Sequence, residues 1–280
     1  VMASDPDADR VGAAVKNNEG EWVLLNGNQT ALMFVYYLIT RWKELGKING
    51  KEYIVKTIVT TETIKTIAER NGVEMYDVYT GFKWIANVMR ENEGKKNYIG
   101  GGEESYGFLC EDFVRDKDAV SACVILAEIA AWAKDQGLSL YQLLQKIYVE
   151  YGFSKEKGIS VVKKGKSGAE EIEAMMKKFR ENPLTEIAGS KVTYFYDYST
   201  LKGKDYAENE TVTLDMPTTS NVLQYFTEDN TKVSIRPSGT EPKIKFYCEV
   251  HSKVKSIDEL PEAEKAAEEK INQIKASLGI

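Results

Sequence analysis

Hydrophobic residues recur at two different spacings along the first half of the chain. Apolar positions three or four residues apart predict helices at about 29–45, 61–70, 81–90, 118–134 and 139–150. Short apolar or alternating runs predict strands at 11–15, 21–25, 53–59, 73–79 and 97–100. Because strands and helices alternate over residues 23–150, we expect a three-layer α/β domain with a mixed sheet in this part of the chain.

The pattern changes near residue 151. A strand at 158–163 and a helix at 168–180 come first, and an amphipathic helix at about 257–278 closes the chain. Between the two helices, alternating runs predict strands at 191–198, 211–215, 222–227, 232–235 and 243–250. This order predicts an α+β domain with a mostly antiparallel sheet over residues 151–280, with a domain boundary near residue 150.

Composition and charge narrow the classes of protein. The chain has 280 residues and a net charge of −6, from 37 Lys and Arg against 43 Asp and Glu, which disfavours nucleic acid as a partner. The longest apolar run, 31–39, is too short to cross a membrane, and no signal peptide opens the chain. Three cysteines without a CxxC pair fit a reducing cytosol, so we expect a cytoplasmic protein. The single histidine, His251, disfavours a Ser-His-Asp triad or a histidine-rich metal site.

The chain begins VMASDPDADR, with no initiator Met and with an apolar, strand-like start. An acidic motif follows within ten residues of the terminus. Because termini are usually frayed, a functional motif so close to one leads us to expect that upstream sequence has been removed and that this chain is a fragment.

The first motif that could carry chemistry is DPDADR at residues 5–10. Its carboxylates, Asp5, Asp7 and Asp9, are hard oxygen ligands on a tight loop and suit Mg²⁺ or Ca²⁺. An EF-hand would need Gly where Arg10 stands and Glu at the twelfth loop position, and the chain has neither. We therefore favour Mg²⁺ with positions left open for phosphate oxygen or water; a solvated acidic turn is the alternative.

The second motif is GGGEESYG at residues 100–107. Its glycines allow the backbone to approach a polyol closely, while Glu103 and Ser105 can exchange hydrogen bonds with sugar hydroxyls. Taken alone, the motif is also compatible with an ordinary acidic turn.

The third motif is RPSGTEPK at residues 236–243, between two alternating strands. The Arg236 guanidinium and the hydroxyls of Ser238 and Thr240 suit a phosphate group, and Gly239 allows backbone N–H groups to form an anion-binding nest. The spacing differs from that of a P-loop, so nucleotide binding is not implied. A fourth stretch, TGFKW, places Lys83 at a strand-to-helix turn, where an anion would be favoured, but taken alone the stretch indicates a solvated surface lysine between core aromatic residues.

Taken in this order, the motifs resemble those of the α-D-phosphohexomutase family, in particular its phosphoglucomutase and phosphopentomutase-like branch. DPDADR is similar to the family's magnesium loop, GGEESYG to its sugar-binding loop and RPSGTEPKIKFY to its phosphate-binding loop, and TGFKWI also fits. Family members have four domains around one cleft, and the first domain carries a phosphorylated serine in a T-A-S-H-N-P-like loop that does not occur in this sequence. The resemblance thus implies that residues 1–22 are the remnant of the second domain, that 23–150 and 151–280 are the third and fourth domains, and that the missing N-terminal domains are partners.

The resemblance also implies a mechanism. The phosphoserine donates to a hydroxyl of a hexose monophosphate, a bisphosphate forms and turns over, and the other phosphate returns to the serine. It implies Mg²⁺ as cofactor, glucose 1,6-bisphosphate as activator or intermediate, and a sugar phosphate as substrate. The implied roles are magnesium binding by Asp5, Asp7 and Asp9, charge beside the transferring group from Arg10 and Lys83, sugar binding by Glu103 and Ser105, and binding of the unreactive phosphate by Arg236, Ser238, Gly239 and Thr240. The roles of Glu104 and Lys117 stay open.

The leading hypothesis is therefore the C-terminal part of a phosphoglucomutase that interconverts glucose 1-phosphate and glucose 6-phosphate, with the fragment itself inactive. A phosphomannomutase and a phosphopentomutase are close alternatives. A non-catalytic module that binds a sugar phosphate or a metal ion is an alternative of another class. A structural domain with coincidental loops is disfavoured because three motifs occur together and in order.

Overall fold

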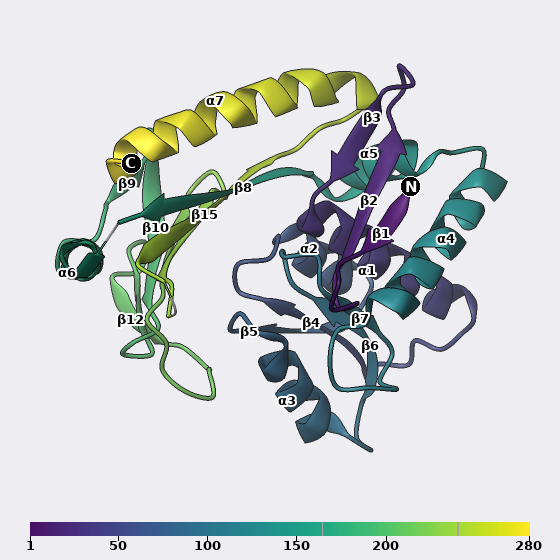
Figure 1. The fold of residues 1–280 in the computed structure, drawn as a ribbon, viewed down its shortest axis with the longest axis horizontal. Coiled ribbons are helices and arrows are strands. Elements are labelled where there is room, and N and C mark those ends of the chain that lie inside the picture. The colour runs from purple at the N-terminus through teal and green to yellow at the C-terminus, as the bar shows by residue number, and fades with distance from the viewer. Residues whose placement is uncertain (164, 240) are drawn as a thin grey trace. The chain divides into compact units, whose positions relative to one another are not determined.

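The computed structural model describes residues 1–163, 165–239 and 241–280 and is drawn as a ribbon in Figure 1. The chain forms two compact units. The first unit comprises Val1–Gly152 and Lys253–Ile257, and the second comprises Phe153–Ser252 and Asp258–Ile280. Each unit has its own sheets and helices and is described by itself.

The first unit opens with a three-stranded antiparallel sheet of β1 (Met2–Ser4), β2 (Val11–Lys16) and β3 (Trp22–Leu25), in that order. The turn between β2 and β3 forms because the Asn17 side chain accepts hydrogen bonds from the backbone N–H groups of Glu19 and Glu21, at 3.1 and 2.8 Å. The loop between β1 and β2 contains the DPDADR motif. The small sheet therefore holds both ends of the acidic loop.

The second sheet of this unit has the strand order β5-β4-β6-β7. Its strands are β4 (Glu52–Thr57), β5 (Glu74–Val78), β6 (Asn97–Gly102) and β7 (Phe108–Cys110). The first three strands are parallel and β7 is antiparallel to β6. Every residue of β4 is buried, as expected for a central strand of a sheet that is covered on both faces.

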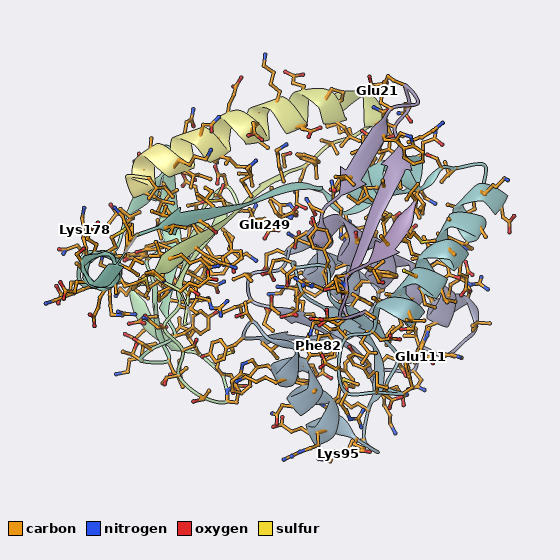
Figure 2. The ribbon with its side chains drawn as sticks, in the orientation of Figure 1. Glu21, Phe82, Lys95, Glu111, Lys178 and Glu249 are labelled. Atoms are coloured by element: carbon orange, nitrogen blue, oxygen red, sulfur yellow. The ribbon has the colours of Figure 1, made fainter. Side chains whose placement is uncertain are left out.

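Helices cover both faces of this sheet (Figure 1). They are α1 (Gly27–Glu44), α2 (Thr63–Arg70), α3 (Phe82–Asn92), α4 (Ala119–Asp135) and α5 (Leu140–Tyr151). Phe82 lies at the sheet-facing end of α3 (Figure 2), in a core that it shares with Tyr53 and Val55 of β4. Capping boxes at Asn26 and Ser139 begin α1 and α5. None of the helices in the described part of the chain is both long and apolar enough to span a bilayer.

The second unit is built on an antiparallel sheet of order β12-β11-β10-β13-β14-β15-β8, with β9 paired to β10. The strands are β8 (Phe153–Val162), β9 (Glu186–Ile187), β10 (Ser190–Asp197), β11 (Lys202–Asp205), β12 (Glu210–Thr213), β13 (Leu223–Thr227), β14 (Lys232–Pro237) and β15 (Lys243–Ser252). The helices are α6 (Gly165–Glu181) and α7 (Leu260–Leu278), the latter preceded by the short turn η1 (Ile257–Glu259).

Alternation along β13, β14 and β15 separates an apolar face from a polar face. Phe246, which is fully buried, meets Phe179 of α6 with ring centroids 6.3 Å apart, and the Tyr225 hydroxyl donates to the Phe179 carbonyl at 3.0 Å. On the polar face, Gln224 donates to the Ser234 hydroxyl at 2.7 Å. The architecture of the two units confirms the predicted fold class, a three-layer α/β part with a mixed sheet followed by an α+β part with an antiparallel sheet.

Candidate functional site

The three glycines of the GGGEESYG motif are the last residues of β6, and the rest of the motif follows at the carboxyl end of that strand, where the ends of the parallel strands meet at one edge of the sheet. Glu103 is 8% exposed, and its carboxylate accepts a hydrogen bond from the backbone N–H of Gly81 at 2.8 Å. Gly81 precedes α3 with φ 111°, a conformation that glycine adopts without strain. The backbone N–H of Glu103 donates to the Gly107 carbonyl at 2.9 Å and closes the loop. The carboxylate of Glu103, which the sequence predicts to bind a sugar, is therefore held at the N-terminus of α3, where a negative charge is favoured.

The next residues of this loop are held by other elements. The Glu104 carboxylate accepts a hydrogen bond from the Thr57 hydroxyl, at the end of β4, at 3.2 Å. A Cβ atom on Gly27, at the start of α1, would lie only 2.0 Å from the Glu104 carbonyl oxygen. Ser105 is exposed. The loop is thus anchored through Glu103 and Glu104, while Ser105 is exposed at its surface.

The acidic loop is closed by one of its own carboxylates. Asp5 accepts hydrogen bonds from the backbone N–H groups of Asp9 and Arg10, at 3.1 Å each, and from Arg10 Nε at 2.7 Å. Desolvation raises the pKa of Asp5, but the hydrogen bonds from Arg10 and Asp9 outweigh it and lower the pKa to about 2. Asp5 is therefore an anchor of the loop in this arrangement, while Asp7 is exposed.

Asp9 has two unlike oxygens. Its Oδ2 pairs with Lys117 Nζ at 2.9 Å, while its Oδ1 is buried and accepts no hydrogen bond from the described residues, with Arg10 Nε 3.5 Å away. Lys117 lies just before Asp118, the N-cap of α4, and its Nζ is 5.9 Å from the centre of the Phe82 ring. The sequence left the role of Lys117 open, and the structure places it beside the acidic loop.

The acidic loop and the glycine-rich loop meet directly. Arg10 and Gly107 form an antiparallel β-bridge, and the backbone N–H of Val11 donates to the Tyr106 carbonyl at 3.1 Å. Each loop also contains a non-glycine residue with positive φ, Ala8 at 55° and Tyr106 at 73°. Such backbone conformations cost free energy and are found where the surrounding structure imposes them, often at functional sites. Two motifs that are far apart in the sequence thus form one local cluster.

Lys83 lies in the first turn of α3, as the sequence predicted for a strand-to-helix turn. Its Nζ is 5.1 Å from the centre of the Trp84 ring, and the side chain is exposed. Lys83 is two residues from Gly81, whose backbone N–H binds the Glu103 carboxylate of the glycine-rich loop.

The carboxylates of DPDADR are not arranged as a ready metal site. Within the described residues, no group of three or more His, Cys, Asp or Glu side chains is placed to hold a metal ion. The donor chemistry nevertheless fits Mg²⁺, since the loop offers three carboxylates and the buried Oδ1 of Asp9 is an atom that a cation would satisfy.

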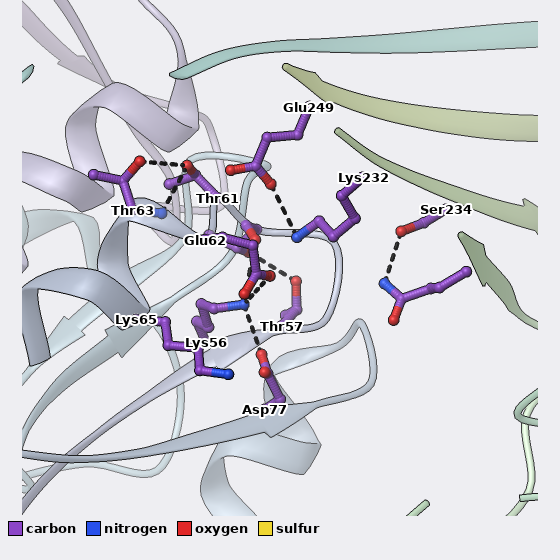
Figure 3. A network of polar contacts seen from close by, with 12 residues as sticks. Lys56, Thr57, Thr61, Glu62, Thr63, Lys65, Asp77, Lys232, Ser234 and Glu249 are labelled. Atoms are coloured by element: carbon purple, nitrogen blue, oxygen red, sulfur yellow. Dashed lines mark hydrogen bonds and ion pairs between the residues drawn. The ribbon is translucent and has the colours of Figure 1, made fainter. Parts of the chain in front are cut away.

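A buried ion network lies at the same sheet edge and was missed by the sequence analysis (Figure 3). Lys56, in β4 and 1% exposed, pairs with Glu62 at 2.9 Å and with Asp77 at 2.7 Å. A buried lysine requires such partners, because an unpaired charge would be costly away from water. The network ties the end of β4 to β5 and to the residue that precedes α2, and it borders Thr57. Its three members lie in β4, in β5 and in the loop before α2, so no local pattern in the sequence could reveal it.

The RPSGTEPK motif forms the hairpin between β14 and β15 in the second unit, as predicted. The backbone N–H of Ser238 donates to the Lys243 carbonyl at 2.8 Å, and Glu241 pairs with Lys243. The hydrogen bond from Lys243 lowers the pKa of Glu241. Gly239 has open space around its Cα, and Thr240 lies outside the described residues.

Basic side chains gather at this end of the sheet. Arg236 and Lys245 are register partners on neighbouring strands, and Ser160 of β8 is the register partner of Lys245. Like charges directly opposite one another destabilise a strand pair, so this pairing favours an anion beside them. Arg236, Lys245 and Ser160 form a row of polar side chains beside the turn of the hairpin, and of these only Ser160 was absent from the sequence-based interpretation of the motif.

Comparison with known proteins identifies the family. Residues 26–151 match the model of the phosphoglucomutase/phosphomannomutase α/β/α domain III, and residues 160–267 match the model of the phosphoglucomutase/phosphomannomutase C-terminal domain. The chain therefore belongs to the phosphoglucomutase/phosphomannomutase family, which confirms the predicted resemblance.

Curated relatives support this assignment. The chain is 38% identical over 247 residues to a phosphoglucomutase of Staphylococcus aureus (strain MRSA252), which covers 88% of the chain and 44% of that protein. It is 34% identical over 251 residues to a phosphoglucomutase of Staphylococcus haemolyticus, and the aligned residues make up 90% of this chain and 45% of that protein. The chain thus spans less than half the length of these relatives.

Solved structures agree on the fold. The structure aligns with pp63/parafusin, a phosphoglucomutase of Paramecium, with a TM-score of 0.59 at 18% identity, over 100% of this chain and 46% of that one. It aligns with a phosphomannomutase-like protein of Thermus thermophilus with a TM-score of 0.58 at 20% identity, over 95% and 45%. At these identities the likeness supports the shared fold.

Proposed function

We propose that this chain is the C-terminal part of a phosphoglucomutase that interconverts glucose 1-phosphate and glucose 6-phosphate through a phosphoserine and a bisphosphate intermediate. The observation that carries the proposal is the β-bridge between Arg10 and Gly107, because it joins the acidic loop to the glycine-rich loop in one cluster. A phosphoryl group and a sugar hydroxyl must be held side by side during transfer, and adjacent binding loops suit that requirement. The two phosphoglucomutase relatives support the choice of reaction.

In this proposal each group of residues has its own role in binding the sugar phosphate. Glu103 accepts hydrogen bonds from sugar hydroxyls through its remaining oxygen, and Ser105 contributes a hydroxyl donor. Arg10 and Lys83 supply positive charge beside the transferring phosphoryl group. The β14–β15 hairpin binds the phosphate that does not react, through Arg236, Ser238, Gly239 and Thr240.

Asp5, Asp7 and Asp9 are the residues that would hold Mg²⁺, which neutralises charge on phosphoryl oxygens when bound. The phosphoryl donor in the proposed reaction is a serine phosphate outside this chain. The bond between phosphorus and the serine oxygen breaks as the sugar hydroxyl bonds to phosphorus, and the hydroxyl proton ends on the serine oxygen. The bisphosphate then returns its other phosphoryl group by the same step in reverse.

Calorimetric titration with glucose 6-phosphate tests the phosphate hairpin. Replacing Arg236 by Ala removes a charged hydrogen-bond donor, and we expect affinity to fall about 10- to 100-fold. Lys265→Ala is the matched control, because Lys265 is an exposed cation on α7 and its loss should leave affinity unchanged. Equal binding by Arg236→Ala and the unmodified protein would show that the hairpin is not the phosphate site.

The same titration addresses the identity of the sugar. The family model spans phosphoglucomutases and phosphomannomutases, so glucose 6-phosphate and mannose 6-phosphate are the informative pair. We expect tighter binding of the glucose compound. Preference for the mannose compound would replace the proposed reaction with that of a phosphomannomutase, and binding of inorganic phosphate alone would reduce the chain to a phosphate-binding module.

A further inference from the structure

Three consecutive residues of the glycine-rich loop are used in different ways. Glu103 is bound by the N-terminus of α3, and Glu104 is bound by Thr57 of β4, while Ser105 is exposed. The proposed function uses Glu103 and Ser105 but leaves Glu104, the acid between them, without a role.

The surroundings of Glu104 restrict the loop from two sides. Its side chain is held by the Thr57 hydroxyl at 3.2 Å, and Thr57 also shares a hydrogen bond with the Thr60 hydroxyl at 2.8 Å. Its carbonyl lies against Gly27, so closely that any side chain at position 27 would overlap with it. The side chain and the backbone of one residue are therefore fixed by β4 and by α1, respectively.

The supporting elements are themselves rigid. Thr57 is fully buried and follows Lys56, whose ion pairs with Glu62 and Asp77 tie β4 to its neighbours (Figure 3). The start of α1 is held because the Asn28 side chain accepts a hydrogen bond from the backbone N–H of Thr61 at 3.0 Å. A loop that is attached to such a frame keeps its neighbouring ligands in fixed positions at little entropic cost on binding.

We propose that Glu104 is a positioning residue of the sugar-binding loop: through Thr57 and Gly27 it fixes the loop on β4 and α1, and thereby fixes the Glu103 carboxylate and the Ser105 hydroxyl for a sugar phosphate. This inference rests on the proposed function for the identity of the ligand. It assigns Glu104 no contact with the ligand itself.

Affinities for two ligands separate positioning from general damage. Thr57→Val keeps the shape of the side chain and removes its hydroxyl, and Glu104→Ala removes the acceptor. We expect each variant to bind glucose 6-phosphate about tenfold more weakly, since one hydrogen bond to a charged group is lost. Affinity for inorganic phosphate should stay within about twofold, because the phosphate hairpin belongs to the second unit. Glu104→Gln retains an acceptor oxygen and should recover most of the affinity.

The two variants should also be coupled. If Thr57 and Glu104 act through their shared hydrogen bond, the double variant will bind about as weakly as either single variant. Thr40→Val and Glu19→Ala are the matched controls, because Thr40 donates within α1 and Glu19 is exposed in the β2–β3 turn. Unchanged glucose 6-phosphate affinity in Thr57→Val, or losses that simply multiply in the double variant, would overturn the proposal.

Hydrogen exchange gives an answer that does not depend on the ligand. The Glu103 amide, which donates to the Gly107 carbonyl, should exchange about tenfold faster in Thr57→Val and Glu104→Ala than in either control. If the unmodified protein fails to bind glucose 6-phosphate while the variants still accelerate this exchange, the proposed substrate is wrong and the positioning role stands. If exchange is unaltered, the positioning role is wrong whatever the substrate.

Discussion

At the scale of single residues, the candidate site depends on close contacts between positions that are far apart in the sequence. Gly27 is the clearest case, because the backbone of the glycine-rich loop occupies the space where a side chain would begin. Overlap with a backbone atom cannot be relieved by turning a flexible side chain, so either the start of α1 or the loop must move.

Gly27→Ala should therefore lower the free energy of unfolding by about 1–3 kcal/mol. Gly12→Ala is the matched control, since a Cβ atom there would meet only the Ala3 carbonyl at an ordinary 3.9 Å. Urea denaturation of the two variants measures the difference. Equal stability of both variants would show that the loop does not press against α1 as described.

The residues that sequence analysis found and those it missed differ in a physical way. Asp5, Asp7 and Asp9 lie within one short loop, so their spacing indicated a candidate metal-binding motif, while the role of Arg10 came only from the family resemblance. Lys56 gave no such signal, because its partners come from separate elements and only the fold brings them together. The same holds for Gly27 and Glu104, whose contact joins a helix start to a distant loop.

At the scale of elements, helices were the easiest features to predict because their caps and periodicity agree. The helix predicted at 118–134 is α4, and the Asp118 side chain caps it by accepting hydrogen bonds from the backbone N–H groups of Val120 and Ser121, at 3.2 and 3.0 Å. The strands that escaped prediction are short. The three residues of β7, the two of β9 and the four of β11 offer too few positions to show alternation, and pairing with neighbouring strands defines them.

The Asp118 cap predicts a dependence of stability on pH. Burial raises the pKa of Asp118, but hydrogen bonds from Ser121 and Val120 lower it by more, so the folded-state pKa lies below the usual value near 3.9. The cap therefore stabilises the fold at pH values above about 4, and this contribution is lost as the pH falls through the folded-state pKa.

Asp118→Ala should lower the free energy of unfolding by about 1 kcal/mol at pH 7, with a smaller effect at pH 3. Asp118→Asn serves as the control, since asparagine caps a helix without titrating. Thermal unfolding at the two pH values measures both variants. A loss of the same size at pH 3 and pH 7 in Asp118→Ala would contradict the role of the ionised cap.

At the scale of the whole molecule, the chain carries the proposed binding groups in separate places. The acidic and glycine-rich loops belong to the first unit and the phosphate hairpin to the second. The proposed reaction also needs a phosphoserine, and the chain spans only 44–45% of the two staphylococcal phosphoglucomutases and 46% of the Paramecium structure. The proposal therefore assigns binding of a sugar phosphate to this chain, whereas turnover also requires the phosphoserine.

We accordingly expect the purified 280-residue protein to bind glucose 6-phosphate and to show no mutase turnover. Phosphoryl transfer requires a phosphoryl donor as well as residues that align it and neutralise its charge. The proposal places that donor, a phosphoserine, outside this chain, so the binding residues alone should give no turnover. A coupled assay with glucose 1-phosphate, Mg²⁺ and glucose 1,6-bisphosphate measures turnover, with an intact phosphoglucomutase as the positive control. Turnover that depends on Arg236 would mean that the phosphoryl donor lies within these residues, and the division between binding and transfer would have to be abandoned.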